Sequence, residues 1–137
     1  MAAILKDETA SITTSGDIVR VRQLVREWAI SLGFSLVEQT KMVTAASELA
    51  RNALDYGGGG NVRVQALNND TRRGLKLTFI DDGPGIADLD QALKDGFTTG
   101  RGMGLGLGGA KRLVNEFEID SAPGRGTKVM ITRWRNA

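Results

Sequence analysis

A segment dense in glycine constrains this chain more than any other feature. Between residues 83 and 109, glycine occupies positions 83, 85, 96, 100, 102, 104, 106, 108 and 109. Glycine loses more backbone freedom on folding than any other residue, so this density predicts either a flexible linker or a backbone that must approach a ligand closely. Leu105, Leu107, Ala110 and Leu113 continue at helical spacing through the segment, which argues against a linker.

Composition limits the class of protein. A length of 137 residues with 41% hydrophobic content predicts one domain, spanning 1–137, with a single core. The chain has no apolar run that could span a bilayer, no convincing secretory signal and no cysteine, so we expect a cytoplasmic protein with no membrane contact. A net charge of +2, with basic and acidic residues mixed, argues against nucleic acid as a partner. The absence of histidine excludes it as general base, zinc ligand or phosphoacceptor.

Hydrophobic periodicity predicts the order of the elements. Helices are expected over 16–34, with Asp17 as N-cap and Gly33 as the stop, and over 36–56, before a flexible glycine run at 57–60. Alternating residues predict a hairpin from 61–67 and 75–80, and a short strand is expected at 8–14. A short helix at 88–95 and a longer one at 104–116 precede a closing antiparallel pair, 117–120 and 127–134. This order predicts an α+β domain with helices packed on one face of a mixed, mainly antiparallel sheet.

The stretch "SELARNALDY" carries the first candidate motif. Glu48 and Asn52 stand four residues apart, so a helix would present both side chains on one face. A carboxylate accepts a proton from a hydroxyl, and a carboxamide oxygen binds Mg²⁺ without adding charge. Taken alone, the pair fits a solvated helix face better than a site. The small or apolar neighbours Ala45, Leu49 and Ala53 favour a closely packed helix that aims the pair into a cleft.

The second motif, "DDGPGI", directly follows a predicted strand. Asp81 at the strand end would accept a hydrogen bond from an exocyclic amine such as that of adenine, and Gly83 and Gly85 would let the loop turn toward a flat base. Taken alone, this motif fits a glycine-proline turn with two solvated carboxylates better.

The third motif, "GRGMGLGLGGAKRL", leads into a predicted helix. Unpaired N–H groups at a helix start attract phosphate, and glycines at 102, 104 and 106, with Leu105 between them, would let phosphate oxygens reach those groups. A Walker A loop is excluded because no Gly-Lys-Ser/Thr occurs, and a dinucleotide-binding loop would lie after the first strand.

In their order, these motifs resemble the GHKL ATP-binding superfamily and its Bergerat fold. The resemblance implies that Glu48 and Asn52 form the N box, that Asp81, Gly83 and Gly85 form the G1 box, and that the glycines at 102, 104 and 106 form the G2 box. It also implies that Thr127 of "GRGT" lies near adenine beside Asp81. Tyr56 is a departure, because many anti-sigma-factor kinases have a histidine at this position, one helical turn after the asparagine.

The short chain and the stretches 17–52 and 95–127 resemble the anti-sigma-factor kinases, and most closely the RsbT-type switch kinases of the stressosome. The resemblance implies a serine/threonine kinase that uses ATP and Mg²⁺ to phosphorylate a STAS-type antagonist protein, and that then activates a PP2C-type phosphatase. Glu48 would orient or deprotonate the acceptor hydroxyl and Asn52 would hold Mg²⁺. Arg101 is a candidate γ-phosphate contact, whereas Arg51 faces either the site or the helix surface.

Two alternatives remain open at this stage. One is an anti-sigma factor or ATP-dependent binding module with little kinase activity, which captures a phosphatase or a sigma factor through exposed C-terminal residues such as Arg133, Trp134 and Arg135. The other is an ATPase that hydrolyses ATP without a protein acceptor.

Overall fold

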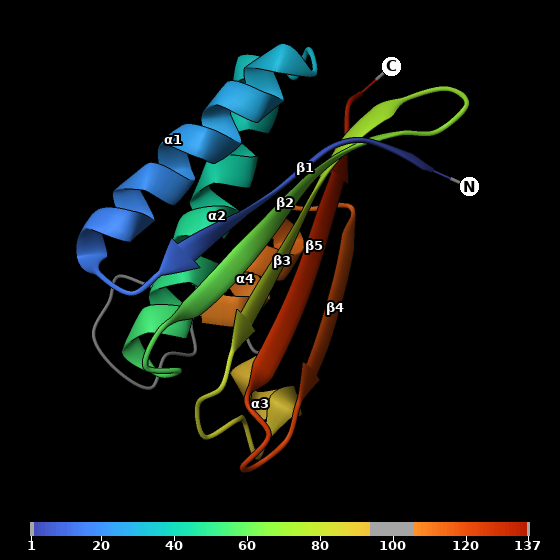
Figure 1. Cartoon of the computed structure of the whole chain (residues 1–137). Helices are drawn as coiled ribbons and strands as arrows, with labels where there is room; N and C mark the ends of the chain where they lie inside the picture. Colours follow the sequence, from blue (N-terminus) through green and yellow to red (C-terminus); the bar gives the residue numbers. More distant parts are fainter. Residues whose placement is uncertain (1, 94–105, 137) are drawn as a thin grey trace.

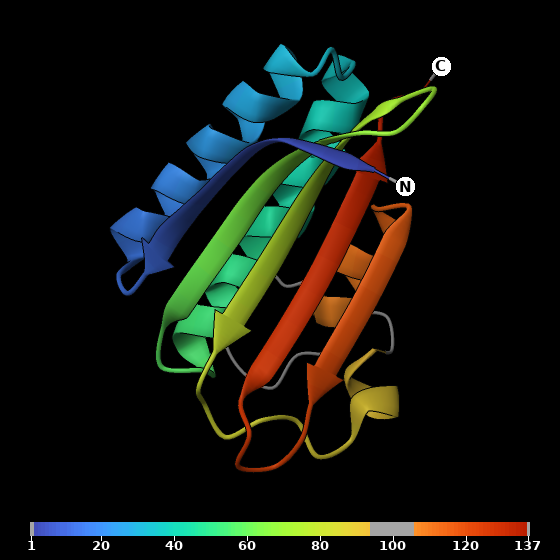
Figure 2. The ribbon, with the colours of Figure 1, turned by 45° about the vertical axis from the view of Figure 1, so that its right-hand side comes forward.

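The described strands form one five-stranded sheet in the order β1-β2-β3-β5-β4 (Figure 2). The structure is a computed structural model that describes residues 2–93 and 106–136. All four strand pairings are antiparallel, so the expected mixture of directions is not seen in this part of the chain. The strands are β1 (Ala3–Ile12), β2 (Gly60–Asn68), β3 (Arg73–Asp81), β4 (Glu116–Ser121) and β5 (Thr127–Trp134).

The helices cover one face of this sheet, as the sequence predicts (Figure 1). They are α1 (Ser15–Ser31), α2 (Leu36–Asp55), α3 (Leu89–Ala92) and α4 (Gly106–Arg112). Helix α1 forms because Ile18, Val21, Val25 and Trp28 recur at helical spacing and bury one stripe. Helix α2 packs against both α1 and α4 and therefore lies at the centre of the helical layer. No helix in the described ranges is long and apolar enough to cross a bilayer.

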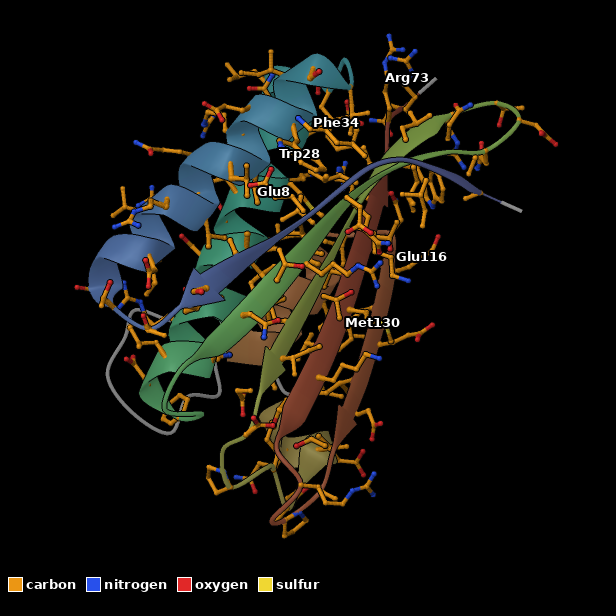
Figure 3. All side chains as sticks on the ribbon, viewed as in Figure 1. Glu8, Trp28, Phe34, Arg73, Glu116 and Met130 are labelled. Atoms are coloured by element: carbon orange, nitrogen blue, oxygen red, sulfur yellow. The ribbon has the colours of Figure 1, made fainter. Side chains whose placement is uncertain are left out.

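The core lies between the helices and the sheet because side chains alternate along each strand. Leu75, Leu77 and Phe79 of β3 point to the helical side and are almost fully buried. Figure 3 shows Trp28 on the same side, whereas Met130 on β5 belongs to the opposite face of the sheet. The described core residues form one continuous cluster, which carries the site on a single rigid framework.

The start of α1 differs from the expectation. Thr14, not Asp17, is the N-cap: the Thr14 hydroxyl accepts from the Asp17 N–H, and the Asp17 carboxylate accepts from the Thr14 N–H. Both residues belong to one capping box, in which Asp17 takes the third helical position. Gly33, with φ of +84°, follows the last turn as predicted.

Other boundaries also shift. Strand β1 begins at Ala3 rather than at residue 8, because an edge strand tolerates charged residues such as Lys6, Asp7 and Glu8. Helix α4 ends at Arg112 rather than at residue 116, and β4 begins at Glu116, one residue earlier than expected. The glycine run is not a flexible spacer throughout, since Gly60 already belongs to β2.

Candidate functional site

Helix α2 presents Glu48 and Asn52 side by side. Both are half-buried, while Leu49 and Ala53 beside them are buried. The four-residue spacing puts the carboxylate and the carboxamide on one face, one helical turn apart. The small residues let the helix pack closely, so the pair faces a cavity instead of open solvent.

The ends of two neighbouring strands supply the other polar side chains. Asp81, the last residue of β3, pairs in register with Thr127, the first residue of β5. The Asp81 carboxylate accepts a hydrogen bond from the Gly83 N–H at 3.0 Å. Because β3 and β5 are antiparallel neighbours, the end of one strand and the start of the other present both side chains together on the helical side.

These elements surround a cavity of about 400 Å³, a size typical of small-molecule sites. Phe79, Val129, Leu49 and Ile86 provide apolar walls that suit a flat ring. Of the residues predicted from the sequence, the cavity is lined by Glu48, Asn52, Asp81, Gly85, Gly106 and Thr127, with Arg51 also at its edge.

The glycines of the second motif shape the loop beside the cavity. Gly85 has φ of +78°, and a Cβ there would lie 2.0 Å from the Ala122 carbonyl oxygen. Gly83 is not part of the cavity wall, but its N–H holds Asp81. The predicted contacts Arg101, Gly102, Gly104 and Leu105 lie outside the described residues.

Sequence reasoning missed two residues at this site. Gly57 was assigned to a flexible run, yet a Cβ there would lie 2.3 Å from Cγ of Asp81. Ser121, at the end of β4, contacts Thr127 with its hydroxyl at 2.8 Å. The glycine run itself was the only local signal for Gly57, and no local pattern marked Ser121. Arg133, expected to be exposed, is buried and donates to the Leu113 carbonyl.

The electrostatics of Asp81 suit a hydrogen-bond acceptor inside a cleft. Burial raises the pKa of Asp81, and this is the largest effect. The hydrogen bond from the Gly83 N–H lowers the pKa, the nearby charge of Asp82 raises it, and the Thr127 N–H lowers it. An ionised carboxylate only accepts hydrogen bonds, so Asp81 is suited to an amino group presented by a flat ligand.

The raised pKa of Asp81 predicts that this residue costs stability at neutral pH. The folded state binds the Asp81 proton more tightly than the unfolded state, so the free energy of unfolding falls as pH rises from the ordinary carboxyl pKa through the raised one. We expect Asp81→Asn to gain melting temperature relative to the wild type between about pH 4 and about pH 7. Thermal unfolding across this range measures the difference, and Asp120→Asn controls for the loss of one charge. A relative loss of stability for Asp81→Asn on raising the pH would contradict this assignment.

Residues 37–136 match the family described as histidine kinase-, DNA gyrase B-, and HSP90-like ATPase. The chain is 44% identical over 123 residues to the serine/threonine-protein kinase RsbT of Bacillus subtilis, covering 90% of this chain and 92% of that relative. It is also 30% identical over 119 residues to an anti-sigma F factor of Thermoanaerobacter, covering 82% of each chain.

Solved structures share the fold. The RsbU and RsbW domains of a Mycobacterium tuberculosis protein match 96% of this chain with a TM-score of 0.63 and 23% identity. This chain spans only 34% of that structure. The mycobacterial sensor histidine kinase MprB matches with a TM-score of 0.56 and 22% identity, covering 96% of this chain and 100% of that structure. The expected α+β fold with helices on one face of the sheet is thereby confirmed as the GHKL type.

Proposed function

Because this chain belongs to the family of histidine kinase-, DNA gyrase B- and HSP90-like ATPases, we propose that it transfers the γ-phosphoryl group of ATP to a serine or threonine of a STAS-type antagonist protein. Its 44% identity to RsbT over most of both chains makes it a serine/threonine-protein kinase of this family. The proposal places the reaction in the cytoplasm, where ATP is available.

One observation carries the proposal: Glu48 and Asn52 from α2 and Asp81 and Thr127 from the sheet face the same cavity. The cavity has the volume for a nucleotide base, apolar walls for its faces and an acceptor for its amino group. Glu48 and Asp81 reach this cavity from different elements, α2 and β3. Two elements suit a ligand whose base is recognised by one and whose phosphates are handled by the other.

The side chains also fit a magnesium nucleotide. Among the described residues no group of three or more acidic side chains could cage a metal ion, whereas Asn52 offers one neutral oxygen in the cavity. This donor set suits Mg²⁺, which is commonly held by one or two protein ligands together with substrate phosphates. The bound nucleotide would supply the γ-phosphoryl group and its metal would neutralise the phosphate charge.

In the mechanism that we propose, Asp81 and Thr127 hold the base, and Asn52 holds the metal side of the triphosphate. Glu48 accepts the proton of the acceptor hydroxyl as its oxygen attacks phosphorus in line with the leaving ADP. The helical face that sets Glu48 and Asn52 one turn apart would place this base next to the phosphoryl group. Gly83 and Gly85 of the loop after β3, Gly106, and the further residues Arg101, Gly102, Gly104 and Leu105 are proposed nucleotide contacts.

Labelling tests the proposal directly. The purified chain is incubated with Mg²⁺, [γ-³²P]ATP and a STAS-domain antagonist, and the label is located by phosphoamino acid analysis. We expect phosphoserine or phosphothreonine on the antagonist and little free phosphate. Steady ATP hydrolysis with an unlabelled antagonist would favour the simple ATPase and contradict the proposed transfer.

A second output, capture of a regulatory partner, is favoured by the 30% identity to anti-sigma F factors. We propose that the kinase, once released from its antagonist, binds and activates a PP2C-type phosphatase; a sigma factor is the alternative partner. Trp134 is a poor contact candidate because its ring packs over Gly74 and its indole N–H donates to Glu116. Activation of the phosphatase by a folded but inactive Glu48→Gln variant would separate this output from catalysis.

A further inference from the structure

Three polar side chains lie in one row across the end of the sheet. Ser121 of β4 pairs in register with Thr127 of β5, and Thr127 pairs with Asp81 of β3. Thr127 and Asp81 line the cavity, whereas Ser121 lies behind Thr127. Ser121, the last residue of β4, therefore acts on the nucleotide site through Thr127.

The Ser121 hydroxyl makes three contacts. It accepts a hydrogen bond from the Ile86 N–H at 2.9 Å, lies 3.0 Å from the Gly126 carbonyl oxygen and lies 2.8 Å from the Thr127 hydroxyl oxygen. A serine hydroxyl has one proton and two lone pairs. A carbonyl only accepts, so the Ser121 proton goes to Gly126.

The direction of the remaining hydrogen bond follows by counting protons. Ser121 has no second proton, so the 2.8 Å contact is a hydrogen bond that Thr127 donates and Ser121 accepts. Thr127 has then used its only hydroxyl proton. The side that Thr127 turns to the cavity carries lone pairs alone.

We infer that Ser121 fixes Thr127 as a hydrogen-bond acceptor and thereby makes the cavity selective for a purine with an amino group, rather than an oxo group, at C6. This inference rests on the proposed nucleotide site and assigns its base specificity. Asp81 is an acceptor as well, but a 6-oxo purine still offers it an N1–H donor. Thr127 adds a second acceptor to the site. The 6-oxo oxygen is also an acceptor, so it leaves Thr127 without a hydrogen-bond partner.

Two glycines bring the backbone segments near Ser121 into close contact. A Cβ on Gly85 would lie 2.0 Å from the Ala122 carbonyl oxygen, and one on Gly126 would lie 2.2 Å from the Asp81 carbonyl oxygen. The loop after β3 and the turn before β5 therefore touch backbone to backbone around Ser121. This close packing holds the donor Ile86 N–H and the acceptor Gly126 carbonyl in place, and with them the direction of the Thr127 hydroxyl.

Calorimetry with ADP and IDP, which the kinase does not consume, tests the inference in the presence of Mg²⁺. We expect the wild type to prefer ADP, and Ser121→Ala to lower the ratio of the IDP to the ADP dissociation constant by about tenfold, because Thr127 regains a free proton. Ser121→Thr keeps the hydroxyl and is expected to keep the ratio. If Ser121 had a purely structural role, Ser121→Ala would weaken the binding of ADP and IDP equally. The ratio of the two dissociation constants would then equal that of the wild type, and this result would overturn the inference.

A double-mutant cycle covers the case in which Ser121→Ala folds poorly. Thr127→Val removes the acceptor and is expected to lower the ratio by itself, and Ser121→Ala added to Thr127→Val should change it no further. A Thr127→Val protein with the wild-type ratio overturns the inference. Failure of the wild type to bind either nucleotide would instead contradict the proposed function, so the two failures are distinguishable.

Discussion

Glu48→Gln is expected to lower the rate of phosphoryl transfer by about 10²–10⁴-fold, the usual contribution of a general base, while ADP affinity stays near that of the wild type. Glutamine keeps the size and the hydrogen-bonding shape of the side chain but accepts no proton at neutral pH. Glu48 is half-buried on α2, a different element from the strand that carries Asp81, so its loss should spare base recognition. Single-turnover transfer of ³²P to the antagonist measures the rate, and calorimetry with ADP measures binding.

Asp55→Asn is the matched control for Glu48→Gln. Asp55 lies two turns further along α2, lines the same cavity and is exposed, so its substitution removes one negative charge from the site. A comparable loss of rate in Asp55→Asn would indicate a general charge effect. Transfer at the wild-type rate by Glu48→Gln would rule out Glu48 as the base.

Gly57→Ala is expected to weaken nucleotide binding by about 10–100-fold, the range for losing a hydrogen bond to a charged group. A Cβ at Gly57 would lie 2.3 Å from Cγ and 2.6 Å from Oδ1 of Asp81. The carboxylate must swing away or the turn after α2 must move. The Gly83 loop restricts the second outcome, because a Cβ on Gly83 would itself lie 2.5 Å from the Gly57 Cα. Calorimetry with ADP measures the loss.

Gly58→Ala separates this steric effect from backbone strain. Gly58 has φ of +74° and no atom within 4 Å of an added Cβ, so alanine there costs about 1 kcal/mol of stability without touching Asp81. We expect Gly58→Ala to melt earlier and to bind ADP normally. Equal losses of ADP affinity in Gly57→Ala and Gly58→Ala would show that the whole turn, not contact with Asp81, controls binding.

Local patterns in the sequence were sufficient for much of the fold. Alternation in "NVRVQAL" and "LKLTFI" predicted β2 and β3, and the stripe through Val21, Val25 and Trp28 predicted α1. The four-residue spacing of Glu48 and Asn52 also placed both on one side of α2. These inferences succeed because side chains point to the same face at the regular period of a helix or a strand. The order of apolar and polar residues then shows which face is buried.

Boundaries were less predictable because neighbouring residues compete for one role. Thr14 and Asp17 are both good capping residues, and only their reciprocal hydrogen bonds decide which one is the N-cap. The charged residues Lys6 and Asp7 gave no sign of the first part of β1, which pairing with β2 stabilises. Arg133 was expected on the surface, yet alternation along β5 turns it toward the helices.

The order of residues therefore determined which elements form and which side chains share a face, because those properties depend on near neighbours in the chain. The contacts of Asp81 with Gly57 and Thr127, and of Thr127 with Ser121, were decided by the tertiary structure alone. Their contacts depend on the place of β5 between β3 and β4, and on the turn that brings the end of α2 back to the sheet. Such distances arise from the packing of segments far apart in the chain, for which no local period exists.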